Sequence, residues 1–108
     1  MRLRKAYFVY ILKCADDSYY VGVTNDLERR VKEHNESEDE TSFTFSRRPV
    51  ILVHQEVYNY VDKAIDREKQ LKGWSRAKKE ALMENNIAEV ERLGKKKFGR
   101  KNNLRLSD

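Results

Sequence analysis

The chain has 108 residues, which allows one compact domain with a modest core. One Pro and four Gly exclude a low-complexity chain, and a single cysteine, Cys14, excludes an intramolecular disulfide and argues for a buried free thiol over zinc ligation. No apolar stretch approaches the roughly 20 residues that cross a membrane, and no signal-peptide pattern follows the basic start. We therefore expect a cytoplasmic protein without membrane contact.

The net charge of +5 is concentrated near the C-terminal end. Residues 94–108 carry six basic side chains and one acidic side chain, which leaves residues 1–93 with 17 of each sign. A basic surface on the folded body must therefore arise by segregation of charge, not by excess. We expect residues 1–93 to form a single domain and residues 94–108 a basic, flexible tail, either a solvated terminus or a DNA contact.

The first third of the chain predicts a hairpin and a helix. Residues 7–12 are an unbroken apolar and aromatic run, typical of a strand that is covered on both faces. A polar turn at residues 15–18 separates this run from a second β-rich run at residues 19–23. Residues 24–26 offer N-caps to a helix that ends near His34.

The rest of the chain predicts an acidic, exposed loop, a third strand and further helices. The loop covers residues 35–42, the strand covers residues 50–57, and the helices cover residues 61–72, 76–84 and 87–93. Gly73 is expected to end the first of these helices, Ser75 and Asn86 to cap the next two, and Gly94 to end the last. The β-β-α-β-α-α order, with one more short helix, predicts an α+β fold: a three-stranded antiparallel sheet with flanking helices, not a doubly wound one.

A carboxylate interrupts the apolar face of the helix expected over residues 61–72. The apolar stripe of that helix consists of Val61, Ala64, Ile65 and Leu71. Glu68 lies on the same stripe, three residues from Ile65 and from Leu71. Because an unpaired buried carboxylate is strongly destabilising, Glu68 must be ion-paired, metal-bound or at the edge of a cleft.

The first helix repeats this pattern with basic side chains. Arg30 and His34 fall on the same side as Leu27 and Val31, the residues that mark its inward face. An internal salt bridge between Arg30 and Glu68, with His34 packed at the edge, would account for the pattern without any catalytic role. Periodicity alone leaves open whether Arg30, His34 and Glu68 have this structural role or a catalytic one.

Two of the six tyrosines, Tyr10 and Tyr20, fall in the two hairpin strands. A connection of three or five residues would place both on one face of the sheet, whereas two or four residues would place them on opposite faces. Gly22, in the middle of a strand, predicts the close approach of another group over Tyr20. The alternative is that both tyrosines are ordinary core aromatics.

Several short motifs occur in order along the chain: Phe8-Val9-Tyr10, Tyr20-Val21-Gly22, Asn25-Asp26-Leu27-Glu28-Arg29-Arg30, His34, Arg47-Arg48-Pro49-Val50 and Arg67-Glu68-Lys69-Gln70-Leu71-Lys72. Ten residues separate the two tyrosines, and ten more separate Tyr20 from Arg30. The series resembles the GIY-YIG nuclease family, and in particular its small stand-alone bacterial members. The resemblance covers residues 6–84 and implies a GIY-YIG-like fold.

The resemblance also implies roles for five residues. Glu68 would hold one divalent ion, Mg²⁺ or Mn²⁺, and Arg30 would bind the scissile phosphate. Tyr10 and Tyr20 would position or deprotonate the attacking water, and accounts within the family differ on which is the base. His34 would support a catalytic tyrosine. The implied activity is metal-dependent endonucleolytic hydrolysis of DNA, compatible with a structure-selective role in DNA repair or recombination.

The sequence departs from the family pattern at four places. Phe-Val-Tyr and Tyr-Val-Gly replace Gly-Ile-Tyr and Tyr-Ile-Gly. Val23 stands where many members carry a lysine, and the family's downstream asparagine cannot be assigned to Asn85 or Asn86 by spacing. The missing lysine implies slower or more selective chemistry.

Six basic residues that have none of these five roles are the predicted nucleic-acid contacts: Arg47, Arg48, Lys72, Lys95, Lys96 and Lys97. DNA is the expected partner, and RNA stays open as a substrate because phosphate contacts discriminate little between the two. A protein partner could supply specificity, and the oligomeric state cannot be predicted. The alternatives to a nuclease are a non-cleaving nucleic-acid-binding module on the same fold and an interaction protein that docks through its C-terminal helices.

Overall fold

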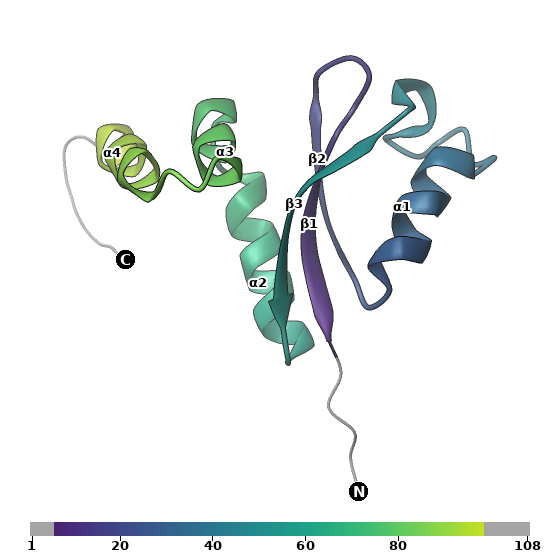
Figure 1. Cartoon of the computed structure of the whole chain (residues 1–108), viewed down its shortest axis with the longest axis horizontal. Coiled ribbons are helices and arrows are strands. Elements are labelled where there is room, and N and C mark those ends of the chain that lie inside the picture. The colour runs from purple at the N-terminus through teal and green to yellow at the C-terminus, as the bar shows by residue number, and fades with distance from the viewer. Residues whose placement is uncertain (1–5, 99–108) are drawn as a thin grey trace, which may run out of the picture. The chain divides into compact units, whose positions relative to one another are not determined.

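The computed structural model describes residues 6–98, which form a three-stranded sheet, four α-helices and one turn of 3-10 helix (Figure 1). The elements are β1 (Tyr7–Lys13), β2 (Tyr19–Thr24), α1 (Leu27–Glu36), η1 (Phe45–Arg47), β3 (Ile51–Tyr58), α2 (Val61–Lys72), α3 (Arg76–Met83) and α4 (Ile87–Phe98). This order, with its antiparallel sheet, confirms the predicted α+β class. The chain divides into two compact units between Gly73 and Trp74, and the sheet, α1 and α2 belong to the first.

The sheet has the order β2-β1-β3, and the central strand β1 pairs antiparallel with both neighbours. Helices α1 and α2 lie on opposite sides of it (Figure 1). Four consecutive residues of β1, Val9 to Leu12, have no exposed surface, which confirms a strand covered on both faces. Because side chains alternate along a strand, Tyr10 and Leu12 face α1, where Leu27 and Val31 pack against them.

The hairpin register settles the placement of the tyrosines. The connection between β1 and β2 is five residues long, from Cys14 to Ser18, and it pairs Tyr10 with Gly22 and Leu12 with Tyr20. Directly paired residues share a face of the sheet, so Tyr10 and Tyr20 lie on the same face. Cys14 is a buried free thiol beside them in the core, as predicted.

The predicted helix caps are present. Asp26 accepts a hydrogen bond from the Arg29 backbone N–H at 3.2 Å and begins α1. Ser75 and Asn86 accept in the same way, from Lys78 at 3.1 Å and from Glu89 at 3.2 Å. The Gly73 N–H ends α2 by donating to the carbonyls of Gln70 and Leu71.

Two details of the helices differ from expectation. In α2 only Ala64 and Leu71 are buried, and Val61 and Ile65 are exposed, so the inward face is narrower than the predicted stripe. Helix α4 runs past its predicted end at Gly94 to Phe98, because a helical glycine weakens a helix without ending it. Residues 99–108 of the predicted tail lie outside the described residues.

Gly94 has a packing role inside the second unit. A Cβ atom at this position would lie 3.1 Å from the Nζ atom of Lys78 in α3, so the absent side chain lets Lys78 approach α4. No glycine among residues 6–98 has a positive φ, so Gly94 is not acting as a left-handed helix stop. None of the helices in the described range is long and apolar enough to cross a membrane.

Candidate active site

The centre of the site is a buried, hydrogen-bonded chain of three side chains. The Tyr10 hydroxyl lies 2.9 Å from Nε2 of His34, and Nδ1 of His34 lies 2.9 Å from Oγ1 of Thr44. Tyr10, His34 and Thr44 are all buried. They come from β1, from the last turn of α1 and from the segment before η1, so the chain ties three separate elements together.

His34 is neutral at pH 7, which defines how the chain can be protonated. Burial, and next the positive charge of Arg30, lower the pKa of His34 to about 4. One ring nitrogen of a neutral imidazole donates and the other accepts. Arg30 also hydrogen-bonds Tyr10, and because an arginine can only donate, the Tyr10 oxygen accepts this bond. The phenol proton is therefore directed to Nε2 of His34. The imidazole proton then lies on Nδ1, where it faces Thr44.

Arg30 is fixed on α1 by neighbours on both sides. Its Nη1 atom lies 3.1 Å from Oε1 of Glu33, and its side chain hydrogen-bonds Tyr10. Burial alone would lower the pKa of Arg30, but the hydrogen bonds to Tyr10 and Glu33 raise it above its ordinary value. The guanidinium therefore stays charged while 41% of its side chain is exposed.

Tyr20 packs directly on this chain. Its ring centroid lies 4.8 Å from that of His34 and 6.2 Å from that of Tyr10. The rings of Tyr20 and His34 meet edge to face, an arrangement that fixes both planes. Tyr20 is only half-buried, whereas Tyr10 has no exposed surface.

Gly22 is needed because of Tyr10, not because of a group above Tyr20. A Cβ atom at Gly22 would lie 2.5 Å from the Tyr10 hydroxyl oxygen and 2.6 Å from the ring carbon that bears it. The Tyr10 ring therefore lies over Gly22 of β2, which is an edge strand. Another group does approach Gly22 closely, as predicted. The pairing of Tyr10 with Gly22 explains why that group is the Tyr10 ring.

Glu68 lies on the inward face of α2, one turn from Ala64 and from Leu71, both fully buried. Its side chain is 18% exposed and its Oε2 atom lies 2.7 Å from Nζ of Lys72. The negative charge of Glu68 contributes to the raised pKa of Tyr10, which places the two within electrostatic reach. The alternative salt bridge with Arg30 is not formed: Arg30 pairs with Glu33, and Glu68 pairs with Lys72.

Glu68 fits a metal ion that is held by one protein ligand. Among residues 6–98 no group of three or more His, Cys, Asp or Glu side chains could enclose a metal. Mg²⁺ suits such a sparse site, because it keeps several waters and is held by one or two carboxylates together with substrate phosphates. A partly exposed carboxylate whose lysine partner is itself 55% exposed meets that requirement.

The six basic residues predicted to contact nucleic acid lie on three different parts of the structure. Lys72 is 55% exposed and pairs with Glu68, beside the candidate metal ligand. Arg47 and Arg48 lie at the end of η1: Arg47 donates to Asp16 of the β1–β2 connection and to the Phe43 carbonyl, and Arg48 donates to the Phe45 carbonyl. Lys95, Lys96 and Lys97 belong to the last turn of α4 in the second unit, and their side chains lie outside the described residues.

Sequence reasoning missed Thr44, which shows no periodicity and lies in a polar stretch. It also missed a polar network on the α2 side of the sheet. Glu56 of β3 accepts hydrogen bonds from His54 at 2.8 Å, from Tyr58 at 2.8 Å and from Arg67 at 2.8 and 3.1 Å. The alternation of polar side chains at residues 54, 56 and 58 is a signal that could have revealed it.

Burial alone would raise the pKa of Glu56, but the hydrogen bonds from His54, Arg67 and Tyr58 lower it to about 2. Arg67 comes from α2 and immediately precedes Glu68 in the sequence. The network therefore anchors α2 to β3 at the residue next to the candidate metal ligand. It is a contact that positions Glu68 without touching the hydrogen-bonded chain.

The arrangement of Tyr10, Tyr20, Arg30, His34 and Glu68 can be compared with known proteins. The model of the GIY-YIG catalytic domain matches residues 6–81. A UPF0213 protein of Haloquadratum walsbyi is 45% identical over 78 residues, which cover 72% of this chain and 86% of the relative. A UPF0213 protein of Staphylococcus aureus is 42% identical over 78 residues, or 72% of this chain and 94% of the relative.

The fold agrees with that of a solved structure. The solution NMR structure of the protein EF2693 from E. faecalis has a TM-score of 0.51 and 28% sequence identity, and the match covers 99% of this chain and 100% of the other. The domain match spans most of the described residues, including all five side chains of the candidate site. The chain therefore belongs to the GIY-YIG catalytic domain family.

Proposed function

We propose that the chain is an endonuclease that hydrolyses DNA phosphodiester bonds with the help of one divalent metal ion. The supporting observation is the convergence of Tyr10, Arg30 and His34 in one hydrogen-bonded group, with Tyr20 packed on it and Glu68 in electrostatic reach. Membership of a family of catalytic domains points the same way. Cleavage of branched or nicked DNA in repair or recombination is the proposed setting.

Arg30 is the residue that binds the scissile phosphate. Its guanidinium stays charged and is partly exposed, and Glu33 and Tyr10 restrict its orientation. A planar, fixed set of donors matches phosphate oxygens, and it stabilises the negative charge that grows on them in the transition state. Binding of a phosphate would add a partner to Arg30 without removing Tyr10.

The two tyrosines have different tasks because their surroundings differ. Burial raises the pKa of Tyr10 to about 12, so the phenol keeps its proton at neutral pH and serves to hold Arg30 and His34 in place. Tyr20 has exposed surface in the same cluster. We therefore assign the contact with the attacking water to Tyr20, and we expect Tyr20→Phe to lower kcat more than Tyr10→Phe.

Glu68 is the residue that would hold Mg²⁺ or Mn²⁺. When bound, the ion would neutralise phosphate charge and stabilise the leaving oxygen. Lys72 pairs with Glu68 in this structure and is mostly exposed, so its ammonium group is free to turn toward a neighbouring phosphate once the carboxylate is engaged. This gives Lys72 its proposed part in substrate binding.

The test is a panel of end-labelled nicked, flapped, branched and plain duplex DNA, each incubated with the full chain in Mg²⁺, in Mn²⁺ or in EDTA. We expect metal-dependent cleavage that falls at least a hundredfold in Glu68→Gln and in Arg30→Ala, the size of effect typical of a lost transition-state contact. Glu80→Gln, which alters an exposed ion pair in α3, is the control. A folded wild-type protein that binds these substrates and cuts none would contradict the nuclease and indicate a non-cleaving binding module.

A further inference from the structure

The segment around η1 carries two pairs in which a guanidinium lies over an aromatic ring. The central carbon of the Arg47 guanidinium lies 4.0 Å from the ring centroid of Phe43, and that of Arg48 lies 4.4 Å from the ring centroid of Phe45. The two pairs have the same chemistry and are close in sequence. Their surroundings differ, and this difference indicates which pair contacts a ligand.

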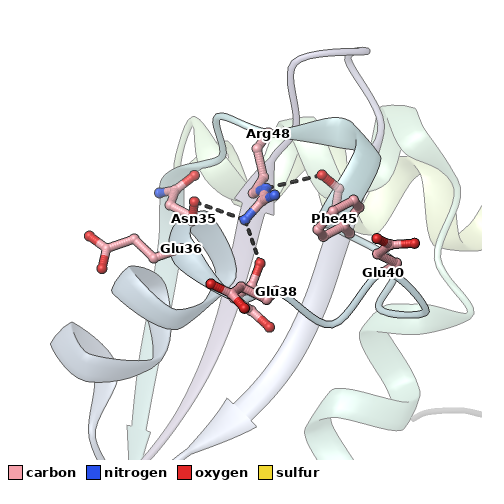
Figure 2. Close-up of a pocket in the computed structure, with 7 residues that line it drawn as sticks. Asn35, Glu36, Glu38, Glu40, Phe45 and Arg48 are labelled. Atoms are coloured by element: carbon pink, nitrogen blue, oxygen red, sulfur yellow. Dashed lines mark hydrogen bonds between the residues drawn. The ribbon is translucent and has the colours of Figure 1, made fainter.

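The pair formed by Phe45 and Arg48 belongs to the scaffold. The Arg48 side chain donates to three backbone carbonyls, those of Phe45 at 3.0 Å, Asn35 at 3.0 Å and Ser37 at 2.8 Å. Figure 2 shows it directed at the carbonyls of Phe45 and Asn35. The hollow around it is also lined by three glutamates, Glu36, Glu38 and Glu40. Carboxylates around an arginine that is already hydrogen-bonded make a poor site for a phosphate.

The pair formed by Phe43 and Arg47 lies beside the candidate active site. Phe43 is 42% exposed, and the centroid of its ring lies 5.8 Å from that of Tyr20. Arg47 is held in place by Asp16 at 3.1 Å and by the Phe43 carbonyl at 2.6 Å. Its guanidinium lies over the Phe43 ring, and the Arg47 side chain remains 34% exposed.

A flat, partly exposed surface of this kind suits a nucleic-acid base. Bases stack on aromatic rings and on the planes of arginine side chains, and such stacking tolerates any base sequence. Because Tyr20 is the next ring along, a base on this surface belongs to a nucleotide close to the phosphate that Arg30 binds. A base in a duplex would have to leave its own stack to reach the surface, so an unpaired base is favoured.

We propose that Phe43 and Arg47 form a stacking platform for an unpaired base next to the cleaved bond, so that the substrates are flapped, gapped or otherwise partly single-stranded DNA. This inference rests on the proposed function, since the phosphate beside the base is the one to be cut. The platform selects DNA structure and not sequence. It gives the small catalytic unit a means of choosing its substrate.

The experiment compares Phe43→Leu and Arg47→Lys with the matched control Phe45→Leu in the full chain. Affinity for flapped DNA is measured by fluorescence anisotropy in EDTA, with either a base or an abasic site at the unpaired positions next to the junction. We expect Phe43→Leu and Arg47→Lys to weaken binding about tenfold when the base is present, the effect of one lost stacking contact, and not when it is absent. Because Arg47→Lys keeps the positive charge, a loss of affinity in this variant reports the loss of the planar guanidinium surface.

A second measurement needs no variant. The fluorescent base 2-aminopurine is placed at the unpaired position that the abasic series identifies. Binding of the wild-type protein is expected to quench the fluorescence of 2-aminopurine more at this position than at paired positions. Equal weakening of base-containing and abasic substrates by Phe43→Leu, or unchanged affinity for both, would overturn the platform. Cleavage that depends on Glu68 but not on Phe43 would contradict the platform and leave the proposed nuclease standing. Base-dependent binding without cleavage in Mg²⁺ would support it and contradict the nuclease.

Discussion

The hydrogen bonds from Thr44 through His34 to Tyr10 are buried along their whole length, so water cannot replace a partner that is removed. The Thr44 oxygen accepts from Nδ1 of His34 and thereby directs the lone pair of Nε2 at Tyr10. Tyr10 in turn holds Arg30. Thr44 is thus a positioning residue that acts through two others on Arg30, the proposed phosphate-binding group.

Replacing Thr44 with valine keeps the shape of the side chain and removes its oxygen. We expect Thr44→Val to lower the free energy of unfolding by about 1–2 kcal/mol, because Nδ1 loses its buried partner. We also expect a lower kcat with little change in KM, measured on the best DNA substrate. Thr44→Ser restores the oxygen and should restore kcat, and a serine variant that fails to do so would contradict this role.

The pKa of His34 predicts how stability changes with pH. Burial and Arg30 lower that pKa from 6.5 to about 4 in the folded protein. Between these values the unfolded chain binds more protons than the folded chain, so the stabilisation is complete above pH 6.5 and is lost as the pH falls towards 4. Urea unfolding at pH 7, 5.5 and 4.5 should show this decline, and His34→Gln should reduce it. An equal decline in the wild type and in His34→Gln would mean that the pH dependence of stability comes from other groups.

At the scale of elements, an ionic contact joins α2 to the sheet beside its few buried apolar side chains. Only Ala64 and Leu71 are buried on this helix, and Arg67 is joined to Glu56 of β3 by two hydrogen bonds. Removing one member of a partly buried ion pair leaves the other without its partner. Because Arg67 precedes Glu68, any movement of the helix also moves the candidate metal ligand.

Glu56→Gln tests this anchor. We expect the free energy of unfolding to fall by about 1.5–3 kcal/mol, the size expected for hydrogen bonds to a charged group. The matched control, Glu80→Gln, alters the exposed pair with Arg76 and should change stability by less than about 1 kcal/mol. Chemical denaturation at pH 7 measures both. Equal effects of the two substitutions would mean that the network does not anchor α2.

The hairpin depends on the absence of a side chain at Gly22. Gly22→Ala places a methyl group against the Tyr10 hydroxyl, which is buried and cannot move away freely. We expect a loss of about 1–3 kcal/mol in unfolding free energy, as for other overpacked cores, together with lower nuclease activity. At Gly73 a Cβ atom would meet nothing closer than 3.5 Å, so Gly73→Ala is the control. A fully stable and active Gly22→Ala protein would refute the close packing.

Local signals explain which parts of the fold were predictable. The apolar run of β1 and the caps Asp26 and Ser75 depend on residues close in sequence, and they appear where expected. No short motif predicts the contact between Thr44 and His34, and the polar alternation at residues 54, 56 and 58 indicates a polar face without indicating the contact of Glu56 with Arg67. The end of α4 was misplaced because Gly94 is a frequent helix terminator, whereas here it makes room for Lys78.

At the scale of the whole molecule, the excess of positive charge lies outside the part of the chain that carries the candidate site. Residues 1–93 are formally neutral, and the excess of basic residues follows them. Long-range attraction of the sheet-bearing unit to DNA must therefore be weak, and its affinity must come from local contacts such as Arg30, Lys72 and the platform of Phe43 and Arg47. Substrate structure, not net charge, is then expected to govern where the protein cuts.

The proposed metal-dependent cleavage of DNA depends on Glu68. Its most direct test is the single-turnover rate on a flapped substrate, measured at rising Mg²⁺ concentrations for the wild-type protein, Glu68→Gln and the control Glu80→Gln. We predict saturable Mg²⁺ dependence for the wild type and the control, and a rate at least a hundredfold lower for Glu68→Gln at every concentration. Cleavage by Glu68→Gln at the wild-type rate and with the same Mg²⁺ dependence would contradict the account.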